Sequence, residues 1–123
     1  MTLLRAALLV LLMALPARAE LAVTEVVSPG GIRAWLVEDH AIPFTALEIR
    51  FRGGTSLDAP GRRGAVNLMA ALLEEGTGDL DAQGFAAARD GLAAEMRFDA
   101  GQDAVAVSAR FLTENRDAAA DLL

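Results

Sequence analysis

The residue types that carry most enzyme chemistry are scarce in this sequence. Its 123 residues include a single histidine, His40, and no cysteine. A chain without cysteine has no thiol nucleophile and no Cys-based zinc site, and one histidine cannot form a His pair. Ser56 and Ser108 would need a histidine base to act as nucleophiles, and only His40 could serve. We therefore predict that His40 is a solvated loop residue rather than a metal ligand.

Carboxylates gather in one part of the sequence, at Glu74, Glu75, Asp79 and Asp81. A calcium loop needs oxygen ligands at alternating positions and a terminal glutamate, and this spacing does not provide them. Acidic residues beside helix ends commonly cap the helix or remain solvated. We therefore assign no metal ligand and no catalytic residue to this cluster.

The charge balance argues against general nucleic-acid binding. The sequence has 11 Lys+Arg, all of them arginine, against 17 Asp+Glu, for a formal net charge of -6. Nucleic-acid-binding proteins present clustered positive charge to the phosphate backbone, whereas these arginines are scattered along an acidic chain.

Residues 1–19 have the pattern of a secretory signal peptide. Arg5 precedes an apolar run from Ala6 to Leu15, and the small residues Ala17 and Ala19 stand before the cleavage point. The apolar run is well short of the roughly 20 residues that span a bilayer. We predict an exported protein, located in the bacterial periplasm, with no stable membrane span after cleavage and a single domain over residues 20–123.

Alternating apolar and polar residues predict β-structure in the first half of the remaining chain. Strands are expected over 21–27, 32–38 and 44–51, separated by turn-forming segments. Trp35, on the second of these strands, is expected in a core or an interface rather than as a ligand platform.

Helical spacing replaces this alternation after Gly64. An amphipathic helix with its stripe on a core is predicted from Ala65, Leu68, Met69, Leu72 and Leu73. A second helix is expected over 81–90, with Asp79 or Asp81 as its N-cap and Gly91 as its C-terminal stop.

Two further strands and a final helical run complete the pattern. The strands are expected over 94–98 and 104–112, and the run 113–123 begins with Thr113 as a candidate N-cap. The run has no stop signal, so we expect the chain to be truncated within a helix whose Ala/Leu face is left exposed. Strands, then helices, then strands again predict an α+β fold, an antiparallel sheet with helices packed on one face.

One block of residues carries a resemblance to a known family. The stretch Arg52–Asp58, the glycines Gly61 and Gly64, the helix that follows and then Glu75–Thr77 resemble the N-terminal domain of the pitrilysin/insulinase (M16) family of zinc peptidases. The family's order of elements continues to the end of the chain. The resemblance implies an incomplete M16-like domain in which Gly53, Gly54, Gly76 and Thr77 shape the loops.

The zinc site of that family is an inverted His-x-x-Glu-His motif on this helix. Histidines at i and i+4 hold the metal, and the glutamate acts as general base on the bound water. Aligned on the family's glycine landmarks, the two histidine positions are Asn67 and Ala71, and the glutamate position is Ala70. These side chains can replace neither an imidazole ligand nor the base. The resemblance implies that the chain holds no cofactor, and that zinc belongs to a catalytic partner.

Three hypotheses about function are consistent with these residues. The first is a non-catalytic M16-family subunit or fragment that joins a subunit carrying His-x-x-Glu-His and contributes structure and peptide-binding surface. The second is an active zinc endopeptidase of the family whose ligands lie outside this chain. The third is a small periplasmic α+β interaction domain.

Overall fold

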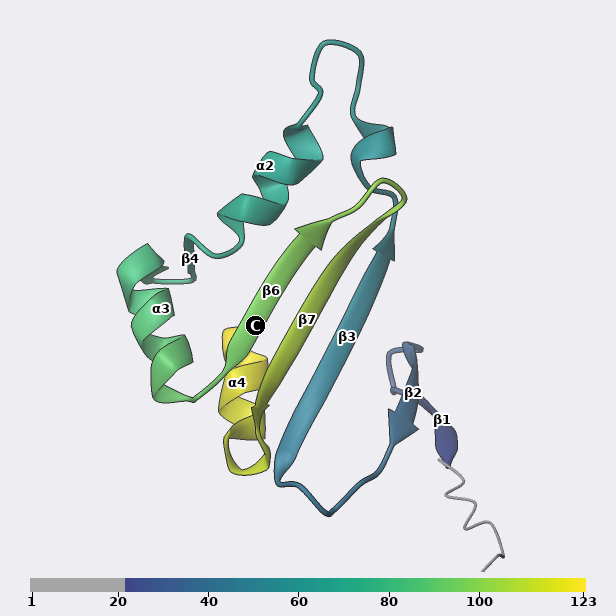
Figure 1. Ribbon diagram of the computed structural model, residues 1–123, viewed down its shortest axis with the longest axis vertical. Helices are drawn as coiled ribbons and strands as arrows, with labels where there is room; N and C mark the ends of the chain where they lie inside the picture. Colours follow the sequence, from purple (N-terminus) through teal and green to yellow (C-terminus); the bar gives the residue numbers. More distant parts are fainter. Residues whose placement is uncertain (1–21) are drawn as a thin grey trace, which may run out of the picture. The chain divides into compact units, whose positions relative to one another are not determined.

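The computed structural model describes residues 22–123, so the predicted signal peptide lies outside the described residues. The chain divides into two compact units, one that ends at His40 and one formed by Ala41–Leu123 (Figure 1). None of the helices in the described part of the chain is long and apolar enough to cross a membrane.

The described part of the first unit is an antiparallel hairpin. Strand β1 (Val23–Val27) pairs with β2 (Arg33–Val37). The turn between them is closed by Ser28, whose backbone N–H donates to the Ile32 carbonyl and whose hydroxyl accepts from Ile32 N at 3.0 Å. Every residue of both strands is exposed. Trp35 is 83% exposed, so of its two predicted places the core is wrong, because two strands alone offer no second layer to bury it, and the interface stays a prediction.

The second unit is built on a three-stranded antiparallel sheet with strand order β3-β7-β6. Its strands are β3 (Phe44–Arg52), β6 (Glu95–Ala100) and β7 (Ala104–Leu112). Phe44 lies opposite Leu112 and Arg52 opposite Ala104, so the pairing runs the whole length of β3. The sequence predicted all three strands to within a few residues, because their two-residue period survives in the folded sheet.

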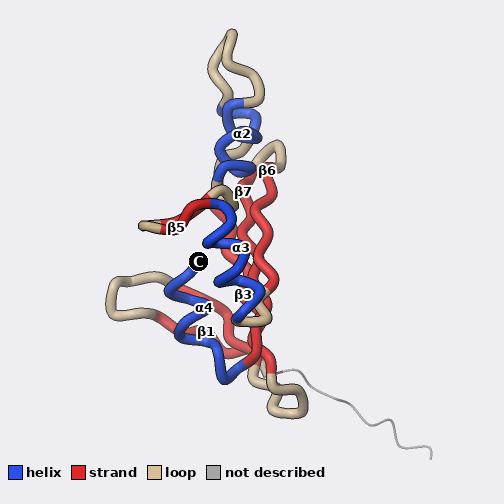
Figure 2. Tube along the Cα trace, turned by 90° about the vertical axis from the view of Figure 1, so that its left-hand side faces the viewer, coloured by secondary structure: helices blue, strands red, loops and turns tan. Residues whose placement is uncertain are grey.

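The remaining elements are short helices and one small ribbon. In chain order they are η1 (Thr55–Leu57), α2 (Ala65–Leu72), β4 (Gly76–Thr77), β5 (Leu80–Asp81), α3 (Ala82–Gly91), η2 (Thr113–Asn115) and α4 (Arg116–Leu122). Helices α3 and α4 lie on one side of the sheet (Figure 2). The buried core is formed by Phe85, Ala94, Met96, Ala109, Phe111, Ala119 and Leu122. The predicted α+β architecture with helices on one sheet face is therefore confirmed.

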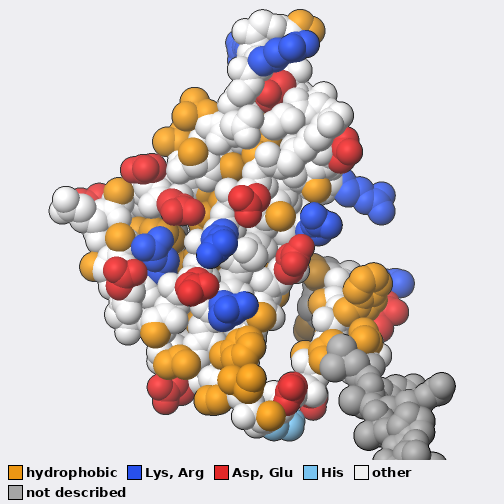
Figure 3. Space-filling view, viewed as in Figure 1, with side chains coloured by type: hydrophobic (Ala, Val, Ile, Leu, Met, Phe, Trp, Pro, Cys, Tyr) orange, Lys and Arg blue, Asp and Glu red, His pale blue; other side chains and the backbone are white. Residues whose placement is uncertain are grey.

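The opposite face of this sheet is polar. Even-numbered residues of β3 and β7, among them Glu48, Arg50 and Arg110, share it with the odd-numbered residues of β6, such as Arg97. Figure 3 shows acidic and basic side chains interspersed over this region. The mixture of signs is typical of a solvated face and gives no single-sign field.

The apolar stripe predicted for helix α2 is not buried in a core. Leu68 is 61% exposed, and Ala70 is the helix residue that is buried. The segment Ala65–Leu73 is apolar almost all round, interrupted only by Asn67. Periodicity therefore could not choose a face, and packing against β6 selected the small side chain of Ala70.

The end of α3 differs from the prediction as well. Gly91 is the last helical residue rather than the stop, and the left-handed position is taken by Ala93, with φ 50°. Ala94 N donates to Arg89 O and Ala93 N to Asp90 O, both at 3.0 Å. These two bonds form a Schellman motif, which usually places glycine where this chain has Ala93.

Helix α4 departs from two expectations. Its N-cap is Asn115 rather than Thr113, and the Asn115 side-chain amide donates to Leu92 O at 2.9 Å, so it ties α4 to the end of α3. Ala119 and Leu122 of α4 are buried, so the predicted exposure of this helix face is wrong. Packing on β7 and α3 already covers it.

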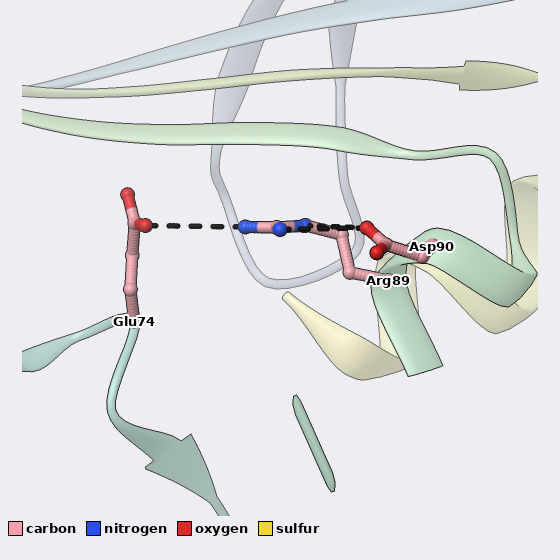
Figure 4. Close-up of polar contacts among 3 residues, drawn as sticks. All are labelled: Glu74, Arg89 and Asp90. Carbon is pink, nitrogen blue, oxygen red and sulfur yellow. Dashed lines mark hydrogen bonds and ion pairs between the residues drawn. The ribbon is translucent and has the colours of Figure 1, made fainter. Parts of the chain in front are cut away.

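An arginine links the segment after α2 to α3. Arg89 lies between two carboxylates, with its guanidinium 3.9 Å from Glu74 Oε2 and 3.4 Å from Asp90 Oδ1 (Figure 4). The side chain is partly buried, while both carboxylates are more exposed. The Glu74 carboxylate is therefore an ion-pair partner, which agrees with a structural role for this acidic residue.

Candidate functional site

The site predicted from the sequence begins at the start of α2, where Asp58 fixes the chain. Gly64 adopts a left-handed conformation with φ 94° immediately before the helix. Its N–H donates to Asp58 Oδ2 at 2.6 Å, and Val66 N donates to Asp58 Oδ1 at 3.0 Å. Both oxygens of one carboxylate thus bind amides that the first helical turn leaves free. The Asp58 side chain is committed to holding α2.

Two glycines join this loop to the turn between β6 and β7. Gly53 has φ 95° and donates to Asp103 O at 2.8 Å, and Thr55 N donates to Gly101 O at 2.9 Å. A Cβ on Gly54 would overlap the Gly101 carbonyl. The prediction that these glycines shape the loops is confirmed for Gly53 and Gly54.

The other predicted scaffold residues form the small β4-β5 ribbon. Gly76 has φ 143°, and a Cβ there would overlap the Leu80 carbonyl. Thr77 lies opposite Leu80. Asp81 then caps α3 by accepting from Gly84 N at 2.8 Å, which confirms the choice of Asp81 as a candidate N-cap.

A polar pocket of about 460 Å³ lies where these loops meet α2. It is lined by Thr55, Ser56, Asp58, Arg63, Gly64, Asn67 and Gln102. The lining holds hydroxyls, amides, one carboxylate and one guanidinium, and it contains no histidine. Such a set can donate and accept hydrogen bonds, but it pairs no base with Ser56. The sequence assigned neither Thr55 nor Gln102 to a site, because only the approach of the loop after β3 to the β6-β7 turn brings them beside Asn67.

The three positions that correspond to the two histidines and the glutamate of the zinc motif, called here the vacated motif positions, have different surroundings. Asn67 lines the polar pocket, Ala70 is buried and Ala71 is exposed. A zinc ion does not fit this set, since an amide and two methyl groups provide no imidazole and no general base. Among the residues described, no three His, Cys, Asp or Glu side chains are grouped to hold a metal ion.

The remaining candidates have ordinary contacts. His40 is exposed, with Nε2 3.7 Å from Glu38 Oε2. Ser108 lies within β7, opposite Glu48 and Arg97. On α4, the pKa of Arg116 is raised because Asp117 accepts its hydrogen bond and adds a favourable charge, and this exposed pair is not part of the pocket.

An apolar groove of about 380 Å³ accompanies the polar pocket on the helix side of the sheet. Its lining residues are Phe51, Gly53, Gly54, Leu57, Val66, Met69, Leu73, Val105 and Val107. The predicted exposed apolar surface therefore exists, but on α2 and β3 rather than on the last helix. Its exposed side chains include Leu57, Met69 and Phe51.

Comparison with known proteins gives two informative similarities. No family model matches the chain. A protein of Helicobacter pylori (strain ATCC 700392 / 26695), described as "Non-peptidase homolog YmxG", is 34% identical over 82 residues, which is 67% of this chain and 19% of that protein. The crystal structure of a peptidase M16 inactive domain from Pseudomonas fluorescens matches with a TM-score of 0.76 and 29% identity, over 83% of this chain and 25% of that one.

The chain spans about a quarter or less of the length of these relatives. Both relatives are described as inactive or non-peptidase proteins, and this chain lacks the His-x-x-Glu-His motif, since His40 is its single histidine. In fold and in sequence the chain is therefore similar to a peptidase M16 inactive domain and to a non-peptidase homologue, and its substituted helix is consistent with a non-catalytic M16-like domain.

Proposed function

We propose that this chain serves as a non-catalytic part of an exported M16-type peptidase assembly, where it contributes structure and peptide-binding surface. One observation carries the proposal: the chain keeps the fold of a peptidase M16 inactive domain, but helix α2 has Asn67, Ala70 and Ala71 at the positions where the family's motif has its two histidines and its glutamate. The assembly would therefore need a separate subunit with an intact motif, which would hold the zinc.

The free edge of β6 supports a role in peptide binding. Within residues 41–123, β6 pairs with β7 alone. An extended peptide can add to such an edge through main-chain hydrogen bonds, so side-chain chemistry at the vacated site is not needed for binding. Gln102, which lines the polar pocket, lies two residues after the end of β6, so this pocket is our candidate for the site that receives one end of such a peptide.

Metal content and peptidase activity test the proposal. The chain alone is expected to contain no stoichiometric zinc and to cleave no unfolded peptide. Mixed with an exported protein that carries His-x-x-Glu-His, it is expected to co-elute with that protein and to raise its activity. A partner with the motif glutamate changed to glutamine is the control, since it should co-elute without activity.

Hydrogen exchange of the complex separates peptide binding from assembly. A peptide added to the β6 edge should slow exchange of amides in Glu95–Ala100 and leave those of β3 unchanged. Stoichiometric zinc in the chain alone would overturn the assignment of the vacated positions. Co-elution without any effect on activity or on β6 exchange would leave a structural role and contradict the peptide-binding part.

A further inference from the structure

The polar pocket beside α2 contains several side chains that make no hydrogen bond or ion pair within the described part of the chain. They are the side chains of Thr55, Ser56, Arg63, Asn67 and Gln102. Two hydroxyls, two amides and one guanidinium thus meet in one hollow of about 460 Å³. These groups are available to a ligand, since the protein itself satisfies none of them.

The pocket is held in shape by backbone contacts. Ser56 N donates to Gln102 O at 3.0 Å, so the loop after β3 is fixed to the β6-β7 turn. On the other side, the two hydrogen bonds of Asp58 fix the start of α2. All of the lining residues belong to the second unit. A pocket whose walls are already fixed loses little conformational entropy when it binds a ligand.

Arg63 makes the pocket suitable for an anion. Its side chain is exposed and forms no ion pair among the described residues, although Asp58 lines the same pocket. Both Asp58 oxygens accept from backbone amides, and the partial positive charge of the α2 N-terminus offsets this carboxylate. One planar guanidinium can donate two parallel hydrogen bonds to a carboxylate, and the hydroxyls and amides around it add further donors.

A carboxylate fits this set better than a phosphate. A phosphate group carries about two negative charges at neutral pH, and here it would meet a single guanidinium, the Asp58 carboxylate and a chain of formal net charge -6. The single charge of a carboxylate is balanced by Arg63 alone.

The lining favours the end of a peptide main chain over a carboxylate side chain. The pocket can accept hydrogen bonds as well as donate them, through the amide oxygens of Asn67 and Gln102 and through two hydroxyls. A terminal carboxylate lies next to a peptide N–H that can donate to such an acceptor. The carboxylate of an aspartate or glutamate side chain is joined to methylene groups, which would leave these acceptors unused. Capture of a C-terminal carboxylate is an established mode of peptide recognition.

We infer that the polar pocket binds the C-terminal carboxylate of a peptide, with Arg63 as its counter-ion and with Asn67 and Gln102 bound to the adjoining main chain. The inference rests on the proposed role in peptide binding and adds which end of the peptide the pocket receives. It concerns the chain alone, so it can be tested without a catalytic partner.

Titration of the chain with N-acetyl-trialanine, followed by NMR, tests the inference. The side-chain amide signals of Asn67 and Gln102, assigned from the spectra of Asn67→Ala and Gln102→Ala, should shift on binding. The same peptide with a C-terminal amide should bind about tenfold more weakly or worse, because the charge-assisted hydrogen bonds to Arg63 are lost. An amidated peptide with a central glutamate and inorganic phosphate distinguish the other sources of negative charge, and both should also bind about tenfold more weakly or worse.

Neighbouring arginines provide matched variants. Arg63→Gln should weaken binding of N-acetyl-trialanine about tenfold or more, whereas Arg62→Gln should leave it unchanged, because Arg62 does not line the pocket. Both side chains are exposed, so both variants should keep the circular dichroism spectrum of the unmodified chain.

Four results would overturn the inference. Equal losses in the two variants would show a diffuse attraction to positive charge, and equal binding of the acid and amide peptides would show that the carboxylate is not recognised. Equal binding of phosphate or of the central glutamate would assign the pocket to another anion. No binding of any probe would show that the chain itself fills the pocket. Co-elution with a catalytic subunit is measured separately, so a failure here is distinguished from a failure of the proposed assembly.

Discussion

Ala70 and Ala71 are adjacent on α2 but differ in environment. Ala70 is 3% exposed, whereas Ala71 is open to solvent. A glutamate introduced at the first position would have to bury its carboxylate. This environment makes restoration of the zinc motif by substitution alone costly in this chain.

We expect Ala70→Glu to lower the free energy of unfolding by about 2 kcal/mol or more, from the cost of burying an unpaired polar group. Ala71→Glu is the matched control and should change it by less than about 0.5 kcal/mol, as most surface substitutions do. Urea denaturation followed by circular dichroism measures both. Equal losses would show that the two sites share one environment, contrary to the structure.

The left-handed residue after α3 offers a second test at this scale. Ala93→Gly is expected to stabilise the protein by about 1 kcal/mol, because an alanine Cβ is unfavourable at positive φ and glycine removes it. Gly91→Ala should also stabilise, by about 0.5 to 1 kcal/mol, because Gly91 lies within the helix and a Cβ there meets open space. The melting temperatures of the two variants test both expectations. A lower melting temperature for Gly91→Ala would show that Gly91, as first predicted, ends the helix.

Helices α2 and α3 differ in how each is held. Helix α3 inserts Phe85 into the core, where it is 2% exposed, and it is capped by Asp81. Helix α2 depends on the Asp58 carboxylate at its first turn and on the small contact of Ala70. The stability of α3 thus comes from burial, and that of α2 mainly from its clamped N-terminus.

Truncation of one large side chain in each helix should show this difference. Phe85→Ala is expected to cost about 3 kcal/mol or more of unfolding free energy, as large-to-small core substitutions do. Leu68→Ala on α2 should cost less than about 0.5 kcal/mol and should lower binding of an apolar dye. A large loss of stability for Leu68→Ala would mean that the predicted stripe is buried after all.

At the scale of the whole molecule, the hairpin and the second unit are separate compact units. Trp35 is the single tryptophan and lies on β2, so its fluorescence reports on the hairpin. A two-stranded hairpin without a covered face is of marginal stability. The second unit has a buried core and three helices that strengthen its sheet.

We therefore expect unfolding of the chain to depend on the probe. The Trp35 signal should change at lower urea than the circular dichroism of the helices, in contrast to the coincident transitions of a two-state domain. Phe85→Ala should move the circular dichroism transition and leave the Trp35 transition in place. If the fluorescence and circular dichroism curves coincide, both in the unmodified chain and in Phe85→Ala, the two units unfold as one.

The sequence by itself was sufficient for the parts of this protein that depend on local pattern. The alternation predicted strands over 44–51 and 104–112, although not that they pair, and Asp81 was one of two candidate caps for the second helix. The lack of a second histidine was enough to exclude the zinc motif at Asn67 and Ala71, because no fold can supply a missing ligand type.

Tertiary structure decided everything that depends on which surfaces meet. Periodicity could group Leu68 with Leu72 but could not say that Ala70 would be the covered side chain, because nearly every face of α2 is apolar. The pocket around Asn67 and the apolar groove on α2 and β3 likewise require knowledge of distant neighbours. Burial is set by the presence or absence of a second layer, and a single linear pattern does not contain that information.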